Sequence, residues 1–120
     1  GLNVHEAVRV LVRQKFGRFL IGHEIELQGQ SDKKYRFDNV LALPSSERLI
    51  VDSVSHHANS INSRTVTHID IKQKGYTGLY QRIVFDDRQQ WEAEELSLLG
   101  VGAIPVALSE AERVLIRMVA

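Results

Sequence analysis

Two aspartates lie in consecutive strand-like runs of the sequence, and they are the residues best suited to chemistry. Asp38 belongs to the run 34–43 and Asp52 to the run 48–55, with turn-forming residues between the two runs. A turn centred near Ser45 would place Asp38 opposite Asp52. Like charges directly opposite each other destabilise a strand pair. The pair therefore predicts a cation, a proton or a basic side chain close to the two carboxylates.

Length and composition narrow the class of protein. The chain has 120 residues, fifteen basic and fifteen acidic side chains, and no cysteine. This length suits one domain with a substantial core, and the balanced charge supports a nucleic-acid partner only through a local patch. The lack of cysteine excludes disulfides, zinc-thiolate sites and cysteine nucleophiles, and favours a reducing compartment.

With no apolar run of membrane length and no signal peptide, we expect no membrane partner and a cytoplasmic location. Because the first residue is Gly1, we expect a domain cut from a longer protein or a product of tag removal.

The spacing of apolar residues predicts a single α/β (α+β) domain over residues 1–120, with the order α-β-β-β-α-β-α-β-α. Asn3 is expected to cap the first helix, with Glu6 as its partner. Three alternating runs joined by short turns predict an antiparallel meander: 19–27, 34–43 and 48–55.

The second half of the chain predicts further helices and two more strands. The segment 59–74 has helical apolar spacing, but its β-branched residues also favour a strand, so both interpretations stay open. Asp87 and Ser109 are expected to cap the last two helices. The strands 82–85 and 103–108 flank a helix, which predicts a parallel pair with a right-handed crossover. The proline in the last strand, Pro105, cannot donate to a ladder, so we expect this strand to lie at an edge or to carry a bulge. We therefore expect a mixed sheet of about five strands flanked by helices.

This order, with one acid on the second strand and one on the third, resembles the PD-(D/E)xK nuclease-like (restriction-endonuclease-like) superfamily, whose core is an α-β-β-β-α-β unit. The matching residues are Asp38 in Phe-Asp-Asn and Asp52 in Val-Asp-Ser-Val. In that family the two acids hold a magnesium ion, and a lysine two residues after the second acid helps to activate water. The resemblance therefore implies a divalent-metal-dependent DNA hydrolase of the prophage or restriction kind, or an inactive relative. An active enzyme would use Mg²⁺ or Mn²⁺, and an inactive relative would need no cofactor.

The sequence departs from the family pattern at the lysine, because Val54 occupies that position. Some members of the superfamily carry the lysine on the following helix, so the resemblance implies Lys72 or Lys74 as its replacement. Members also often carry an extra acid on the first helix, where this chain has Glu6. The predicted catalytic residues are therefore the two aspartates and Lys72, and the predicted metal ligands are the two aspartates and Glu6.

A non-catalytic module on the same scaffold is the alternative function. Such a module would bind nucleic acid or a protein and often dimerises, so DNA and a second copy of the chain are its candidate partners. In this interpretation the aspartates are structural and pair with one of three arginines: Arg36, Arg48 or Arg82. Fold analogy alone does not decide between the two functions.

The histidines suggest a second metal chemistry. His56 shares a predicted strand face with Asp52, and with His68 and His23 it offers ligands for zinc or manganese. A surface pair formed by His56 and His57 is the simpler interpretation. The neighbouring serines have no nucleophile-elbow glycine frame, so a serine hydrolase is not expected.

Two tyrosines, Tyr76 and Tyr80, lie among the basic residues Lys72, Lys74 and Arg82. Aromatic rings among cations suit a nucleic-acid backbone with a stacked base. The same pattern is typical of a loop whose tyrosines pack onto the sheet, and the sequence leaves both interpretations open.

Overall fold

The computed structural model describes residues 1–22 and 24–120. Its four α-helices are α1 (Val4–Phe16), α2 (Ala58–Lys74), α3 (Ala93–Leu99) and α4 (Ala111–Val119). Its strands are β1 (Leu20–Gly22), β2 (Ile25–Gln28), β3 (Lys34–Phe37), β4 (Val40–Ala42), β5 (Arg48–Val54), β6 (Leu79–Phe85) and β7 (Ile104–Ala107).

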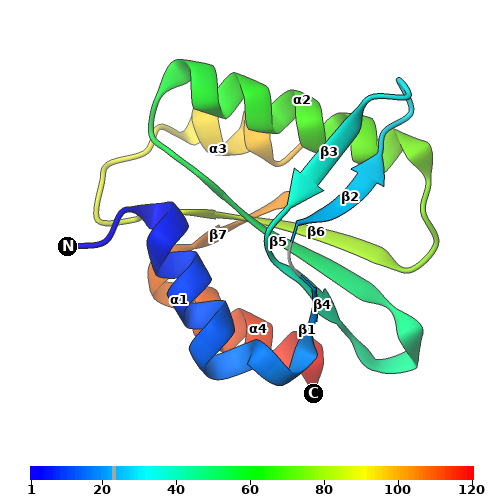
Figure 1. The fold of residues 1–120 in the computed structure, drawn as a ribbon. Coiled ribbons are helices and arrows are strands. Elements are labelled where there is room, and N and C mark those ends of the chain that lie inside the picture. Colours follow the sequence, from blue (N-terminus) through cyan, green and yellow to red (C-terminus); the bar gives the residue numbers. More distant parts are fainter. Residues whose placement is uncertain (23) are drawn as a thin grey trace.

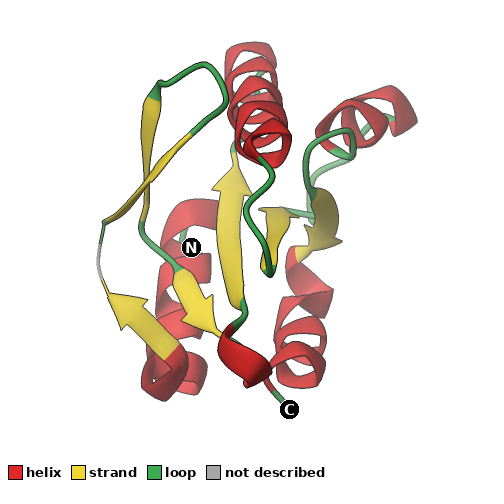
Figure 2. Cartoon of the chain, turned by 90° about the vertical axis from the view of Figure 1, so that its right-hand side faces the viewer, coloured by secondary structure: helices red, strands yellow, loops and turns green. Residues whose placement is uncertain are grey.

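These elements form three layers, as the predicted α/β class requires (Figure 1). A five-stranded sheet of order β1-β4-β5-β6-β7 lies in the middle. One face of the sheet packs against α1 and α4, and the other face packs against α2 and α3. Figure 2 shows the same layers from the side, with the separate hairpin of β2 and β3 beside α2. The sheet is mixed, because β5, β6 and β7 are parallel while β1 and β4 are antiparallel to their neighbours.

The predicted meander is present, but its first two strands are each divided, so the prediction of continuous strands over 19–27 and 34–43 was wrong. The first run contains β1 and β2, and the second contains β3 and β4. β1 pairs with β4 inside the main sheet, whereas β2 pairs with β3 outside it. Glu24 has a left-handed backbone (φ 53°), which turns the chain out of the main sheet between β1 and β2. The hairpin then buries Leu27 and Phe37 next to Ile71 of α2.

The turn between β4 and β5 has the predicted register, with the Cα pairs Val40–Ile50, Leu41–Leu49 and Ala42–Arg48. This ladder ends before Asp38, which lies between β3 and β4. Asp38 therefore does not face Asp52 across a strand pair, and the predicted direct opposition of the two carboxylates was wrong.

The segment 59–74 is helical, which settles the choice that the sequence left open. Gly75 ends α2 with a left-handed backbone (φ 75°), a conformation that favours glycine at helix ends. β7 lies parallel to β6 and at the sheet edge, as predicted. Asn3 caps α1 as predicted, since its side chain accepts the N–H of Glu6.

The predicted cap of α3 was wrong. Asp87 does not begin this helix, because its carboxylate accepts the N–H and O–H of Ser109. Because Ser109 binds Asp87, its side chain does not cap α4, and that predicted cap was also wrong. Glu92 and Glu95 form the capping box of α3 instead. Within the described residues, no helix is long and apolar enough to cross a membrane.

Candidate functional site

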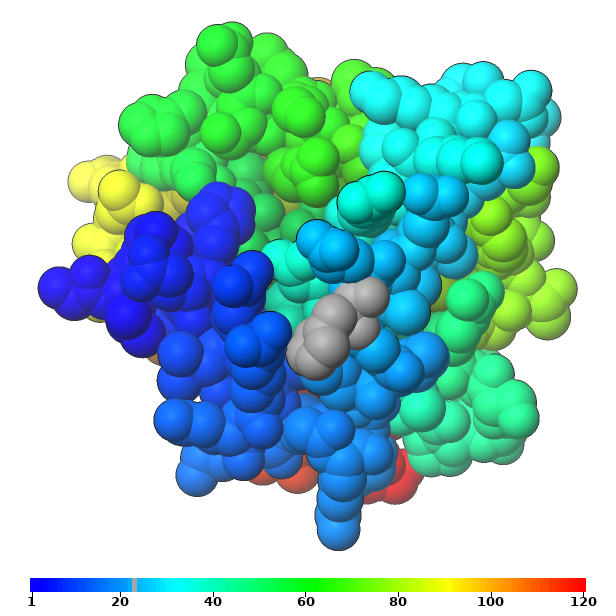
Figure 3. Space-filling view, viewed as in Figure 1, coloured from blue at the N-terminus to red at the C-terminus, as the bar shows by residue number. Residues whose placement is uncertain are grey.

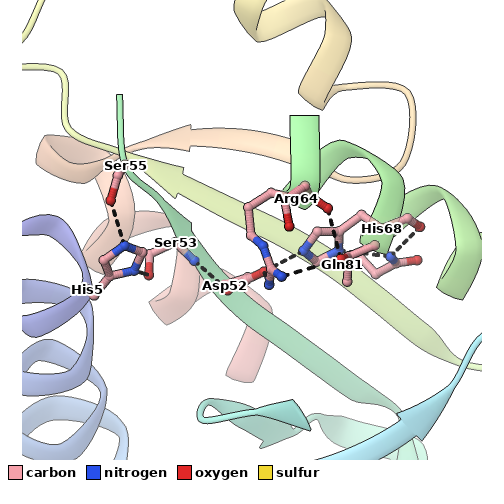
Figure 4. A network of polar contacts seen from close by, with 9 residues as sticks. His5, Asp52, Ser53, Ser55, Arg64, His68 and Gln81 are labelled. Carbon is pink, nitrogen blue, oxygen red and sulfur yellow. Dashed lines mark hydrogen bonds and ion pairs between the residues drawn. The ribbon is translucent and has the colours of Figure 1, made fainter. Parts of the chain in front are cut away.

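Asp52 faces α2, where two helical side chains meet its carboxylate (Figure 4). Arg64 Nη1 donates to Oδ2 at 3.0 Å, and His68 Nε2 lies 2.8 Å from the same oxygen. The backbone N–H of Ser53 donates to Oδ1 at 2.9 Å. Residues four apart share one face of a helix, so Arg64 and His68 approach β5 together. The aspartate thus has the basic neighbour that its sequence context predicted.

The side chain of Gln81 on β6 determines which ring nitrogen of His68 carries the proton. The side-chain Nε2 of Gln81 donates to the carbonyl oxygen of His68 at 2.9 Å and lies 3.0 Å from its Nδ1. An amide nitrogen only donates, so Nδ1 accepts and the imidazole proton sits on Nε2, next to Asp52. A continuous chain of hydrogen bonds therefore runs from Gln81 through His68 and Asp52 to the Arg64 guanidinium (Figure 4).

The partners of Asp52 lower its pKa by more than its burial raises it. Burial by itself raises the pKa of a carboxyl group, because the charged form loses water. At Asp52 the hydrogen bond from His68 and the charge of Arg64 act in the opposite direction, and the pKa of Asp52 lies below its ordinary value. The His68 side chain is 1% exposed, that of Asp52 16% and that of Arg64 29%. Asp52 is therefore an ionised carboxylate whose charge is neutralised from within the protein.

His5 connects α1 to the other face of β5. Its Nδ1 lies 2.6 Å from the Ser53 hydroxyl oxygen, and its Nε2 lies 2.8 Å from the Ser55 hydroxyl oxygen. Residues two apart in a strand project to the same side, which lets one imidazole bridge both hydroxyls. This contact holds the start of α1 against the end of β5 (Figure 4).

Two adjoining cavities form a polar cleft between α1 and α2. Each has a volume of about 250 Å³, and they share His5, Ser53 and Arg64. The first is also lined by Arg36, Phe37, Asp38, Asn39, Val51 and Asp52, and the second by Val54, Ser55, Asn59, Ser60 and Ser63. Figure 3 shows the region, where α1 (dark blue), α2 (green) and the teal chain around β3 and β4 meet. We call these two cavities the polar cleft.

The structure does not bring the three predicted metal ligands together. Asp38 is exposed and pairs with Arg9 at 3.0 Å, while Glu6 accepts a hydrogen bond from Asn3 at the start of α1. In the described ranges 1–22 and 24–120, no group of three or more His, Asp or Glu side chains could hold a metal ion. Magnesium binds carboxylate oxygens that are free to coordinate it, and these carboxylates, Asp52 included, already bind internal donors. The residues therefore do not fit a magnesium ion as they are arranged, and the Mg²⁺ or Mn²⁺ prediction stays a prediction.

Lys72, the predicted catalytic lysine, does not contact Asp52. Lys72 donates from Nζ to the carbonyl of Val101 at 3.2 Å, in the loop after α3, and Lys74 is exposed in the last turn of α2. Val54, at the family's lysine position, is 1% exposed and packs with Ile61 and other apolar residues under α2 and α3. Since that position belongs to the core, a lysine there would be buried away from water.

The histidines that the structure describes do not form a second metal site. His56 stacks on Trp91 with ring centroids 4.1 Å apart, and its Nε2 lies 2.9 Å from Glu95. His68 is bound to Asp52, and His57 precedes α2 at its N-cap. His23 lies outside the described residues.

The sequence predicted arginine partners for the aspartates but named the wrong arginines. The structure supplies Arg9 from α1 and Arg64 from α2 in place of Arg36, Arg48 or Arg82. A usable signal was present, because an arginine and a histidine four apart follow directly after the strand that carries Asp52. This signal depends on a helix over 59–74, and the residues of that segment favour a helix and a strand alike.

No family model, curated protein or solved structure matches this chain.

Proposed function

We propose that this chain is a nuclease-like domain without a catalytic metal centre, and that it binds the phosphate backbone of DNA in the polar cleft. The observation that carries the proposal is the ion pair between Asp52 and Arg64, with His68 hydrogen-bonded to the same carboxylate oxygen. In the superfamily that the sequence resembles, the corresponding acid binds the metal ion. Here a guanidinium provides the positive charge beside that acid. This arrangement favours the non-catalytic alternative over the active hydrolase.

The polar cleft offers the donors that usually contact phosphates. Arg64 has N–H groups beyond the one that binds Asp52. The first turns of α2 add the side chains of Asn59, Ser60 and Ser63. His57, at the N-cap of α2, makes no side-chain cap hydrogen bond in the described structure, so the first N–H groups of this helix lack that partner. Arginines, small polar side chains and helix N-termini are common phosphate ligands in complexes with DNA.

The charges around the cleft favour an anion at its rim. Arg9 is matched by Asp38 and Arg64 by Asp52. Arg36 remains, with a side chain that is 69% exposed and only loosely paired, its Nε lying 3.8 Å from the carboxylate of Glu26. Arg36 is therefore the side chain best placed to attract a phosphate from solvent.

A cytoplasmic location and a second copy of the chain as a partner belong to the same proposal. A chain without cysteine suits a reducing compartment. A two-fold dimer would present two polar clefts to one duplex, as symmetric DNA-binding proteins do.

Binding of fluorescently labelled duplex DNA, followed by anisotropy in EDTA and in magnesium, tests this proposal. We expect binding that does not need magnesium and that weakens as salt increases, because phosphate contacts release counterions. Arg36→Gln should weaken binding about two- to fivefold, the range for one partly exposed charge contact. Arg117→Gln removes the same charge from α4, outside the cleft, and should have no effect. Absence of binding at low salt, or equal weakening by both substitutions, would contradict the proposal.

The active hydrolase is the competing function, and it has its own test. We expect supercoiled DNA to remain intact when incubated with the protein and magnesium or manganese. Metal-dependent cleavage that disappears in Asp52→Asn would establish the active enzyme and overturn the proposal. Loss of that cleavage in Lys72→Ala, with the fold kept, would then identify the predicted lysine.

A further inference from the structure

The beginning of β6 has a strand neighbour on one side only. β5 pairs with β6 from Leu79 onward, whereas β7 begins opposite Arg82. A cavity of about 230 Å³ occupies the space beside the uncovered residues 79–81. Its lining includes Lys72, Leu79, Tyr80, Gln81, Arg82 and Ile104. We call this cavity the β6 notch; apart from Lys72 on α2, its lining comes from β6, β7 and the loop before β7.

Two cations line the β6 notch without an acidic partner. Within the described part of the chain, no carboxylate lies within 4.0 Å of the side-chain nitrogens of Lys72 or Arg82. Lys72 donates to the carbonyl of Val101, and Arg82 Nη1 donates to the carbonyl of Gln81 at 3.1 Å. These carbonyls accept hydrogen bonds but do not cancel the charges. Partial burial also lowers the pKa of Arg82, which means that its charge is incompletely solvated. An anion bound in the notch would give Lys72 and Arg82 a counter-charge and would replace the water that the Arg82 guanidinium has lost.

The remaining surface of the notch suits an extended peptide. An uncovered strand edge offers backbone N–H and C=O groups to an added strand. Tyr80 and Ile104 flank the notch with side chains that are 39% and 54% exposed. Gly102 keeps the wall of the notch close to α2, since a Cβ at this position would lie 2.5 Å from the backbone nitrogen of Ile69. The notch is thus a strand edge flanked by the Tyr80 ring and Ile104, with two cations that lack a carboxylate partner in the described structure; the Tyr80 O–H itself donates to the Glu47 carboxylate at 2.9 Å.

We infer that the β6 notch binds an extended peptide segment that carries carboxylates, from a partner protein. Lys72 and Arg82 hold a carboxylate of the segment, and residues 79–81 pair with its backbone. A single-stranded nucleic acid fits less well, because such strands also need stacked aromatic rings. Of the two tyrosines that the sequence offered for stacking, Tyr80 alone lines the notch, so successive bases would find one ring there; Tyr76 donates its O–H to the carbonyl of Gln28 at 2.8 Å. The inference does not depend on the function proposed for the polar cleft.

Titration of the ¹⁵N-labelled protein with a short peptide of alternating valine and glutamate tests this site. We expect the amide signals of residues 79–82 and of Ile104 to shift, while those of the polar cleft stay in place. The same peptide with glutamine for glutamate should bind more weakly. Lys72→Gln and Arg82→Gln should each weaken binding about two- to fivefold, as expected for a partly exposed ion pair. Lys74→Gln removes a charge from the same helix outside the notch and should leave the affinity unchanged.

Three results would overturn the inference. The first is the absence of shifts at residues 79–82 in the folded wild-type protein. The second is equal weakening by Lys74→Gln and Lys72→Gln, which would indicate a general charge effect. The third is displacement of the peptide by short single-stranded DNA with the same pattern of shifts, which would indicate a nucleic-acid surface. Because Lys72 is exposed, its variant remains informative even where the partly buried Arg82 variant unfolds.

Discussion

At the scale of single residues, the balance of charge at Asp52 determines what the site can do. A buried carboxylate needs a proton, a metal or an internal cation, because its desolvation is costly. Asp52 has Arg64 and His68, and the hydrogen bond from Gln81 orients His68 toward it. The carboxylate to which the sequence resemblance assigned a metal ion therefore already has an internal counter-charge.

The stability of the protein should depend on this carboxylate in a defined pH range. Because the pKa of Asp52 is lower in the folded chain than in the unfolded chain, its contribution is present above about pH 4, the ordinary range of an aspartate, and is lost as the pH falls through the folded value. Asp52→Asn should lower the free energy of unfolding at neutral pH by about 2–3 kcal/mol. This is less than the loss typical of a fully buried pair, because Arg64 is partly exposed. Denaturant titrations should show the gap between variant and wild type shrinking below about pH 4. A gap that is constant down to the lowest pH would contradict the role given to the charge.

The position at which the sequence resemblance implied a lysine can be probed in the same way. Val54 is packed in the core, so Val54→Lys should lower the free energy of unfolding by about 3 kcal/mol or more, because a buried ammonium loses its water. Val54→Met, a larger apolar residue, should cost about 1–3 kcal/mol and serves as the control. Equal and small losses in both variants would show that position 54 can direct a lysine to solvent.

At the scale of elements, α2 organises both the site and the hairpin. The same helix that carries Arg64 and His68 also carries Asp70, which is 8% exposed. The carboxylate of Asp70 accepts the N–H and O–H of Ser31 and the O–H of Tyr35. The hydrogen bonds from Ser31 and Tyr35 lower the pKa of Asp70. One ionised side chain thus ties the β2–β3 hairpin to α2, in addition to the apolar contacts with Ile71.

Loss of this attachment should free the hairpin and leave the sheet intact. In Asp70→Asn we expect faster amide hydrogen exchange over β2 and β3, with β5 and β6 still protected, since local contacts govern local opening. Gly29→Ala should have the same effect, because a Cβ at Gly29 would overlap the Asp70 carboxylate. Gly17→Ala, where an added Cβ meets nothing within 4 Å, is the matched control. Unchanged exchange in the hairpin would show that apolar packing alone attaches it.

At the scale of the whole molecule, the order of elements followed from apolar spacing and turn residues, and the mixed sheet was predictable from the β-α-β tail. The division of the first two predicted strands was not, because a left-handed backbone such as that of Glu24, between β1 and β2, cannot be recognised from a glutamate in the sequence. The charge partner of Asp38 was also beyond the sequence. Arg9 and Asp38 are distant along the chain, and only the packing of α1 against the sheet brings them together. The assembled molecule has a polar cleft at the end of β5 and a cationic notch at the start of β6.

Thermal melting with and without millimolar magnesium or manganese is the measurement that tests the central claim most directly. A ligand that binds only the folded state raises the melting temperature. Because Asp52 is already paired with the Arg64 guanidinium and hydrogen-bonded to His68, we predict no metal-dependent rise in the wild-type protein. A clear rise in melting temperature that Asp52→Asn abolishes would contradict the claim, since it would show that a divalent cation displaces the internal partners and that the acid is a working metal ligand.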